Sequence, residues 1–186
     1  MTSLFHNTTA EKGDLNQYWY SEKICEVLCD AVVESISMKG GESARVAFLS
    51  TPSLYFSLDE KFRKQCTLFD FDSSLGSCCS QFELYDYNHP TNIDPKLHGM
   101  FDTIVIDPPF ITDSVWESYK ATAALLAKDK PHIICTTVEQ NVGLMEQLFN
   151  CKATRFMPSI PKLVYQYNTY ANFPSACLSN TNTELE

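Results

Sequence analysis

Short apolar segments alternate with helix-length segments along this chain, and this alternation constrains its fold more than any other feature. The segments with the length and composition of buried strands are residues 45–49, 66–71, 82–87, 101–106 and 132–136. Helices are expected between them, and two further strands, 153–157 and 163–170, are expected to form an antiparallel pair at the end. The pattern is typical of an α/β fold in which helices cover both faces of a doubly wound, mostly parallel sheet.

The helical segments begin with residue 21, where Ser21 is a suitable N-cap for an apolar stripe that ends before Gly40 and Gly41. A second helical stretch is expected over 53–64 and a third over 114–127. A last one is expected over 138–149, for which Thr136 and Glu139 are the expected capping pair.

The 186 residues suit a single domain, since the sequence has no internal repeat and no interior linker. Residues 1–16 are polar and aperiodic, so we expect them to form a mobile N-terminal arm. Residues 17–177 are expected to form the domain, and 178–186 a polar tail.

The charge of the chain argues against a protein that grips long nucleic acids. Its formal net charge is −9, and it has only 14 Lys and Arg residues with which to neutralise phosphates. A basic protein or a small molecule is the favoured partner. No apolar run reaches the roughly 18 residues of a membrane span, and no signal peptide is apparent, so we expect a cytoplasmic protein.

Residues that directly follow the first four predicted strands are the expected ligand contacts, because ligands bind at the carboxyl ends of strands in open α/β sheets. They are Ser50, Thr51, Pro52 and Ser53, then Asp70 and Asp72, then Asp86 and Tyr87, and finally Asp107, Pro108, Pro109 and Phe110. Three of these sets begin with an Asp, whose carboxylate can accept two hydrogen bonds from the ribose of a nucleoside cofactor. Asp is also a common turn residue, which is the structural alternative.

Asp107-Pro108-Pro109-Phe110 is the strongest functional signal in the sequence. Each proline fixes φ near about −65° and removes an N–H, so the turn is stiff and its prolines offer only carbonyl acceptors. An amine that attacks a methyl group needs its hydrogens held by acceptors while its lone pair faces the carbon. The Asp107 carboxylate and the Pro108 carbonyl can provide these acceptors, and Phe110 can provide an apolar wall. The alternative is that Asp-Pro-Pro merely ends a strand.

This tetrapeptide resembles the (Asn/Asp)-Pro-Pro-(Tyr/Phe/Trp) motif of amino-methyltransferases, which methylate adenine, cytosine or glutamine nitrogens. Further stretches resemble one group more closely, namely residues 17–22, 69–72, 85–90, 101–110 and 158–163. In this order they are similar to the elongation factor 1-alpha lysine methyltransferases, a group once labelled adenine-specific DNA methyltransferases.

The resemblance implies a seven-stranded methyltransferase fold, S-adenosylmethionine as the methyl donor and a lysine of translation elongation factor 1-alpha as the acceptor. The cofactor-binding positions that it implies are the loop Ser50–Ser53, Asp70 and Asp72 at the ribose, Asp86 and Tyr87 beside the adenine, and a lid of residues 17–21 that includes Trp19, Tyr20 and Ser21. Trp19 and Tyr20 are equally suited to a hydrophobic staple on the first helix. The chain departs from the wider pattern because its first loop has no glycine.

Two other functions stay open at this point. An adenine methyltransferase acting on RNA or DNA would use the same Asp107 and stack Phe110 on an unpaired base. A degenerate methyltransferase fold that only binds a partner would bind no donor. For a lysine substrate the ammonium must lose a proton, and the sequence does not identify the acceptor of that proton. No metal ligand spacing is present, and we expect a monomer.

Overall fold

The computed structural model describes residues 11–161 and 163–185, so the first ten residues of the predicted arm lie outside the described residues. One seven-stranded sheet forms the centre of the molecule, in the order β3-β2-β1-β4-β5-β7-β6. Its strands are β1 (Val46–Leu49), β2 (Cys66–Asp70), β3 (Phe82–Leu84), β4 (Phe101–Ile106), β5 (Ala127–Val138), β6 (Lys152–Ala153) and β7 (Tyr167–Ala171). The first five are parallel, and β7 runs antiparallel to both β5 and β6. The predicted α/β fold is therefore confirmed.

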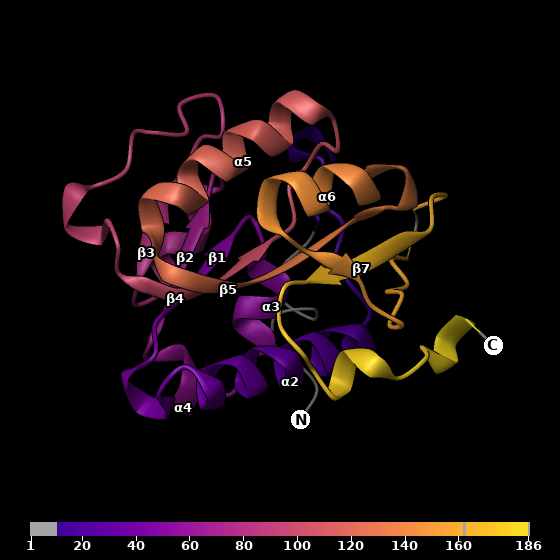
Figure 1. Ribbon diagram of the computed structural model, residues 1–186. Coiled ribbons are helices and arrows are strands. Elements are labelled where there is room, and N and C mark those ends of the chain that lie inside the picture. Colours follow the sequence, from indigo (N-terminus) through magenta and orange to yellow (C-terminus); the bar gives the residue numbers. More distant parts are fainter. Residues whose placement is uncertain (1–10, 162, 186) are drawn as a thin grey trace.

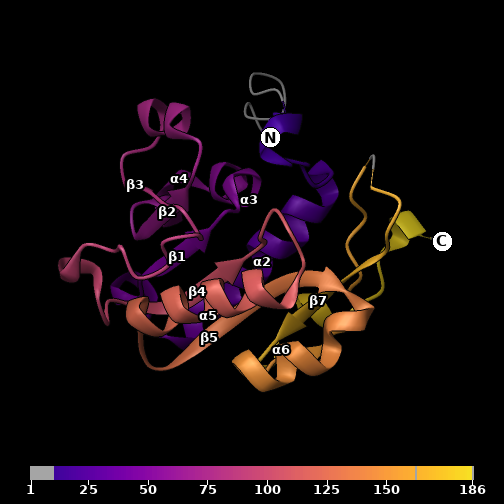
Figure 2. The same ribbon diagram turned by 90° about the horizontal axis from the view of Figure 1, so that it is seen from above.

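Helices cover both faces of this sheet. They are α2 (Glu22–Met38), α3 (Pro52–Ser57), α4 (Glu60–Arg63), α5 (Asp113–Leu126) and α6 (Val142–Phe149). In Figure 1, α5 and α6 lie above the sheet, whereas α2, α3 and α4 lie below it. Figure 2 shows the same layers from above, with α5 and α6 in front of the strands. None of the described helices is long and apolar enough to cross a membrane.

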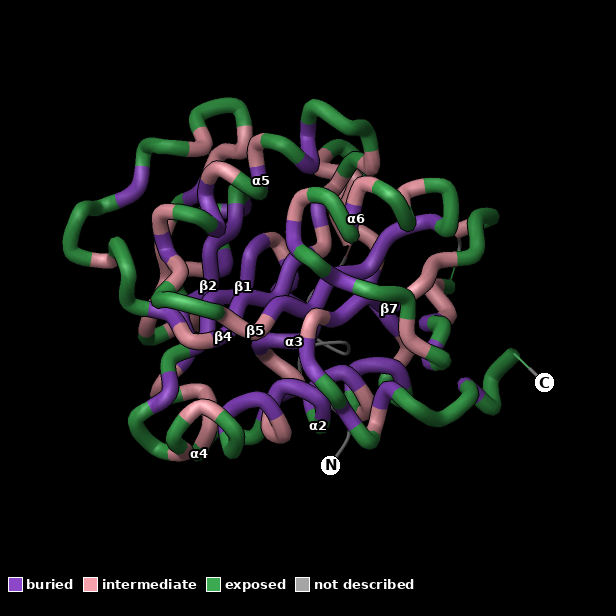
Figure 3. Tube along the Cα trace, viewed as in Figure 1, coloured by how far each residue is buried: buried purple, intermediate pink, exposed green. Residues whose placement is uncertain are grey.

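One apolar core lies on each face of the sheet, because successive side chains of a strand point to opposite faces. In β1, Val46 and Phe48 pack against α2 and α3, while Ala47 and Leu49 belong to the core beneath α5 and α6. Figure 3 shows the central strands as a continuous buried layer between half-exposed helices. Burial on both faces explains why these strands read as uninterrupted apolar runs.

Ser21 caps α2 as predicted, since its side chain accepts a hydrogen bond from the Ile24 N–H. The helix predicted over 53–64 is instead split, because Leu58 is extended and Asp59 caps the new helix α4. The capping role expected of Thr136 was wrong, since Thr136 lies within β5 and α6 begins after Asn141.

The two strands expected at the end pair antiparallel as predicted, but their bounds were wrong. β6 ends at Ala153 and β7 begins at Tyr167. The long connection between them contains Pro158 and Pro161, which cannot donate hydrogen bonds to a sheet ladder. Its residues are therefore free to contribute to a ligand site.

The C-terminal segment packs on the domain. Leu178 lies in the 3-10 helix Cys177–Ser179 and is buried against α2. Asn182 is also buried, and the Glu184 carboxylate accepts hydrogen bonds from the Ser21 hydroxyl. The described part of the predicted tail thus contacts the start of α2.

Candidate active site

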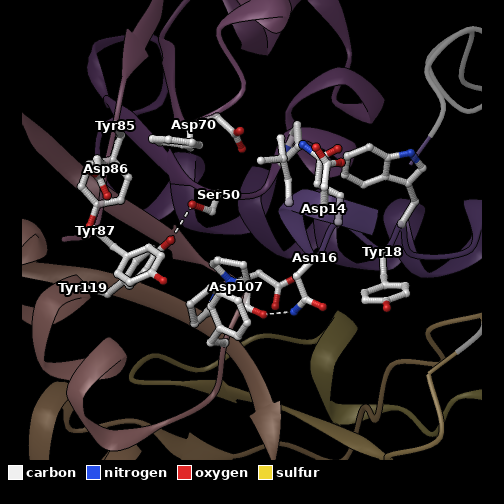
Figure 4. A pocket seen from close by; sticks show the side chains of 18 of the residues that line it. Asp14, Asn16, Tyr18, Ser50, Asp70, Tyr85, Asp86, Tyr87, Asp107 and Tyr119 are labelled. Atoms are coloured by element: carbon white, nitrogen blue, oxygen red, sulfur yellow. Dashed lines mark hydrogen bonds between the residues drawn. The ribbon is translucent and has the colours of Figure 1, made fainter. Parts of the chain in front are cut away.

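A cavity of about 260 Å³ lies at the carboxyl ends of β1, β2, β3 and β4. The residues that line it come from the N-terminal segment, the strand ends, α5 and the connection before β7: Asp14, Leu15, Asn16, Gln17, Tyr18, Trp19, Ser50, Pro52, Asp70, Phe71, Tyr85, Asp86, Tyr87, Asn88, Asp107, Pro108, Pro109, Phe110, Tyr119, Ile160, Leu163 and Tyr167. Figure 4 shows the side chains of Asp70, Asp86 and Asp107 around this space. The site thus forms where the sheet topology predicts it.

Asp107 follows β4 directly and lies in the wall of the cavity. Its Oδ2 accepts a hydrogen bond from the Tyr20 hydroxyl at 2.6 Å, and its Oδ1 accepts one from Thr136 Oγ1 at 3.0 Å. Burial raises the pKa of Asp107 from 3.8 to about 6, although both hydrogen bonds act to lower it. The carboxylate is fixed in orientation, and burial makes it bind a proton more readily than an exposed Asp does.

The N-terminal segment closes over this loop. The Asn16 side-chain amide donates to the Pro109 carbonyl, and Asn16 adopts the left-handed conformation with φ 52°. Figure 4 draws this contact between the segment and the loop. Pro108 also lines the cavity, and its ring fixes φ and keeps the loop rigid. Residues 14–19 line the cavity, whereas the lid was predicted over residues 17–21.

Tyr20 and Ser21 do not line the cavity, which differs from the prediction that they contact the cofactor. Trp19 does line it, and its N–H donates to the Glu11 carboxylate. Tyr20 is 2% exposed, and its hydroxyl donates a hydrogen bond to the cavity residue Asp107. Ser21 caps α2.

Asp70 and Asp72 have different roles, although both were predicted at the ribose. Asp70 lines the cavity, and burial raises its pKa to about 6. One of its oxygens accepts the Asp72 N–H at 2.9 Å. Asp72 lies outside the lining and binds Lys12 Nζ at 2.7 Å and the Ser74 hydroxyl at 2.6 Å. Burial alone would raise the pKa of Asp72, but these hydrogen bonds outweigh it and lower that pKa. Asp72 thereby anchors the N-terminal segment.

The first loop compensates for its missing glycine at Ser50. Ser50 has φ 55°, the left-handed conformation that glycine usually supplies. Its hydroxyl bonds to Tyr119 Oη at 2.6 Å, and its N–H donates to the Phe69 carbonyl. Pro52 also lines the cavity, whereas Thr51 and Ser53 are buried outside the lining.

Aromatic side chains form one end of the cavity. Tyr87 stacks on Tyr119 with ring centroids 6.2 Å apart, and Tyr85 meets Tyr119 edge-on at 5.5 Å. Phe110 is 49% exposed and packs edge-on against Tyr87. Asp86 lies beside them, and the Asn88 N–H is the main cause that lowers its pKa. Such a wall suits a flat ring with polar edges.

The charge lining the cavity is acidic only. Four carboxyl groups line it, from Asp14, Asp70, Asp86 and Asp107, and no Lys, Arg or His is found among its described lining residues. Over the described chain, no group of three or more His, Cys, Asp or Glu side chains is arranged to hold a metal ion. The site therefore favours cationic ligands over anionic ones.

Sequence reasoning missed several site residues, because nothing in the order of the chain places them near the strand ends. Asp14 and Asn16 belong to a polar segment that resembled an arm. Tyr119 lies in α5, the helix that follows Asp107–Phe110, Ile160 lies in the connection before β7, and Tyr167 is the first residue of β7. Only the motif 158–163 hinted at that connection.

The chain was compared with known families and relatives. The model of a family described as probable N6-adenine methyltransferase matches residues 11–175. EEF1A lysine methyltransferase 1 of Danio rerio is 29% identical over 174 residues, which cover 89% of this chain and 100% of that protein. Protein-lysine N-methyltransferase EFM5 of Saccharomyces cerevisiae is 28% identical over 183 residues, covering 88% of this chain and 72% of the relative.

Solved structures share the fold at low sequence identity. A SAM-dependent methyltransferase of Leishmania major is 11% identical with a TM-score of 0.51, and the match covers 81% of this chain and 73% of the other.

Proposed function

Since the chain belongs to the family described as probable N6-adenine methyltransferase, we propose that it is an S-adenosylmethionine-dependent methyltransferase that methylates a lysine amine of translation elongation factor 1-alpha. The observation that carries this proposal is the charge of the cavity, where four carboxyl groups and no basic side chain line the described wall. Both the sulfonium donor and a lysine ammonium are cations, and such a lining attracts both. The relatives named EEF1A lysine methyltransferase 1 support the same substrate.

The residues present fit the donor. Asp70 at the end of β2 accepts the Asp72 backbone N–H, and its carboxylate has further lone pairs that can accept ribose hydroxyls. Tyr85 and Tyr87 offer aromatic edges and faces for an adenine, and Asp86 lies between them in sequence. The donor, once bound, supplies an electrophilic methyl group. The lid formed by residues 14–19 would exclude water from it.

The acceptor amine would be held at the catalytic loop. Asp107 and Pro108 line the cavity, and their carboxylate and carbonyl oxygens are acceptors for the N–H groups of an amine. Phe110 is half exposed at the rim and can pack against the methylene chain of a lysine. Holding the nitrogen in this way directs its lone pair at the methyl carbon.

A nucleic acid substrate is disfavoured by the same charge. An adenine methyltransferase must bring phosphates close to its active site, and those phosphates would meet Asp14 and Asp86 with no basic side chain among the described lining residues to offset them. The family description names adenine, whereas the relatives above are named for lysine methylation. The family description alone therefore does not separate the two substrates.

The test is a transfer assay with labelled S-adenosylmethionine that offers recombinant elongation factor 1-alpha and single-stranded oligonucleotides side by side. We expect label in the protein and its loss when all lysines of the acceptor are chemically blocked. Label found only in the oligonucleotides would overturn the lysine assignment. Absence of donor binding in calorimetry would instead favour a degenerate fold. We also propose that the protein acts in the cytoplasm as a monomer.

A further inference from the structure

Three oxygen-bearing side chains form a closed triangle behind the cavity wall. The Tyr20 hydroxyl lies 2.6 Å from Asp107 Oδ2, and Thr136 Oγ1 lies 3.0 Å from Asp107 Oδ1. The two hydroxyl oxygens lie 2.5 Å from each other. Tyr20 and Thr136 are 2% and 3% exposed, so the triangle is shielded from bulk water. Each of these oxygen–oxygen distances is short enough to require a hydrogen between the two oxygens.

The hydrogens of this triangle do not suffice when Asp107 is ionised. Tyr20 and Thr136 bring one hydroxyl hydrogen each. If both donate to the carboxylate, no hydrogen is left between the two hydroxyl oxygens. A proton on Asp107 completes the ring, because its carboxyl then donates to Thr136, Thr136 donates to Tyr20, and Tyr20 donates to the other carboxyl oxygen.

Both protonation states are thus accommodated. The ionised carboxylate accepts two charge-assisted hydrogen bonds, whereas with a neutral carboxyl the triangle contains three neutral hydrogen bonds, two of which involve the carboxyl. A group built to exchange a proton needs such a balance between its two states.

None of the described titratable groups that interact with Asp107 is a cation. These groups are Tyr20, Tyr119 of α5, Cys135 of β5 and Tyr167 of β7, and a negative charge on any of them would repel the charge of Asp107. Each of these groups has a pKa raised by burial, so each is neutral near pH 7. No basic side chain lines the described cavity wall. In the described site, a positive charge near Asp107 therefore comes from a bound ligand, either the donor sulfonium or the substrate ammonium.

We infer that Asp107 accepts the proton that the substrate ammonium loses before methyl transfer, and that Tyr20 and Thr136 are positioning residues that hold its carboxyl for this purpose. The inference rests on the proposed lysine substrate. An ammonium N–H bond breaks, its electron pair stays on nitrogen, and the proton forms an O–H bond on Asp107. The neutral amine then attacks the methyl carbon, and the electron pair of the C–S bond leaves with sulfur. After product release, Asp107 returns its proton to water.

The pH dependence of kcat/KM for elongation factor 1-alpha tests the inference in the wild type, Tyr20→Phe, Thr136→Val and Thr136→Ser. The wild-type rate should rise with pH through an acidic limb near the pKa of Asp107, about 6. Each lost hydroxyl removes a hydrogen bond to the anion, so the limb should move up by about one pH unit in the Phe and Val variants. Thr136→Ser keeps the hydroxyl and should restore the wild-type limb.

Asp107→Asn separates proton transfer from holding the amine. The asparagine keeps one acceptor oxygen but cannot take a proton. Its rate should fall about 10²- to 10⁴-fold at neutral pH. It should recover as the pH approaches the lysine pKa of about 10.4, where the solution supplies neutral amine. A variant rate that stays near the wild-type value at pH 7 would overturn the inference.

The outcomes distinguish the two proposals. If the wild type transfers no methyl group to the elongation factor, the proposed function is wrong. If it does, but both hydroxyl deletions lower the rate at every pH with an unmoved limb and unchanged donor affinity, the positioning role is wrong. Carbon NMR of the Asp107 carboxyl in the wild-type protein gives a reading independent of folding in the variants. It should titrate near pH 6, and titration below pH 4 would contradict the proton acceptor.

Discussion

Ser50 adopts the left-handed backbone conformation for which glycine is the usual residue. It follows β1 with φ 55°, a conformation that costs a residue with a Cβ about 1 kcal/mol or more. Its hydroxyl bond to Tyr119 connects the first loop to α5 across the cavity. The backbone strain and the hydrogen bond therefore occur in the same residue, and substitutions at Ser50 can separate their effects on stability.

We predict that Ser50→Gly is more stable than Ser50→Ala by about 1 kcal/mol, because both lose the hydroxyl but only Ala keeps a strained Cβ. Thermal unfolding should show this as a difference of about 2–4 °C. Lys130 has φ 51° far along the chain from this loop and outside the cavity lining, so Lys130→Gly and Lys130→Ala are the matched controls. They should repeat the stability difference and leave donor affinity unchanged. Equal stability of the two Ser50 variants would show that the loop relaxes without strain.

At the same scale, the sequence indicates Asp107 but not its partners. Asp107 is recognisable because it ends a buried strand and precedes two prolines. Tyr20 lies 87 positions away and Thr136 lies 29 positions away. Thr136 also has the local features of a helix cap, since a Glu follows three residues later. The strand β5 extends through it, and its hydroxyl is thereby free to bond Asp107.

Among the elements, the N-terminal segment was predicted to form an arm, and its described residues contact the loops at the cavity instead. The salt bridge from Lys12 Nζ to Asp72 and the amide contact from Asn16 to the Pro109 carbonyl fasten it across the cavity. Both attachments end on residues that follow strands of the sheet. The segment carries no apolar periodicity, because its order comes from these polar contacts instead of an apolar face.

We predict that Lys12→Ala weakens donor affinity about fivefold, since a partly exposed ion pair contributes up to about 1 kcal/mol. The lid should then open more often, while the melting temperature changes little. Calorimetry with S-adenosylmethionine measures the effect. Lys128→Ala is the matched control, because Lys128 makes an ion pair of similar exposure and length with Asp102, near the opposite end of β4. An equal loss of affinity in both variants would exclude the tether.

The bounds of the parallel strands were predicted to within three residues, except that β5 begins at Ala127 instead of residue 132, whereas the connection before β7 was not predicted. Buried strands in a parallel sheet are apolar on both faces and stand out in a sequence. Residues 154–166 also contain several apolar side chains, but two of them, Ile160 and Leu163, line the cavity instead of belonging to a strand. Apolar content alone does not distinguish a sheet face from the wall of a ligand site.

For the whole molecule, the acidic cavity carries a cost in stability. Asp70 and Asp107 are both held in surroundings that raise their pKa from 3.8 to about 6. In each case burial is the largest cause, because the folded state disfavours the ionised form. A fold that buries two carboxyl groups at its strand ends gives up free energy of unfolding at neutral pH, as functional sites commonly do.

We predict that Asp70→Asn raises the free energy of unfolding above pH 6 by at most about 3 kcal/mol, because a shift of one pKa unit corresponds to about 1.4 kcal/mol. The folded state binds the Asp70 proton more tightly than the unfolded state does. The favourable contribution of that proton is therefore complete below about pH 4 and is lost as the pH rises through about 6. Asn keeps the oxygen that accepts the Asp72 N–H, so the substitution removes mainly the charge.

Denaturant unfolding of the wild type and Asp70→Asn from pH 4 to pH 8 should give curves that meet at the acidic end, diverge as the pH rises from about 4 to about 6, and run parallel above that. Using the difference between the two proteins removes the contribution of Asp72 and Asp86, whose lowered pKa values act in the opposite direction with pH. The same variant should bind S-adenosylmethionine more weakly, since it loses an ionised acceptor for the ribose. If Asp70→Asn is less stable than the wild type at pH 8, the electrostatic cost of Asp70 is contradicted. If the variant is more stable but binds the donor equally well, that cost stands and Asp70 does not bind the ribose.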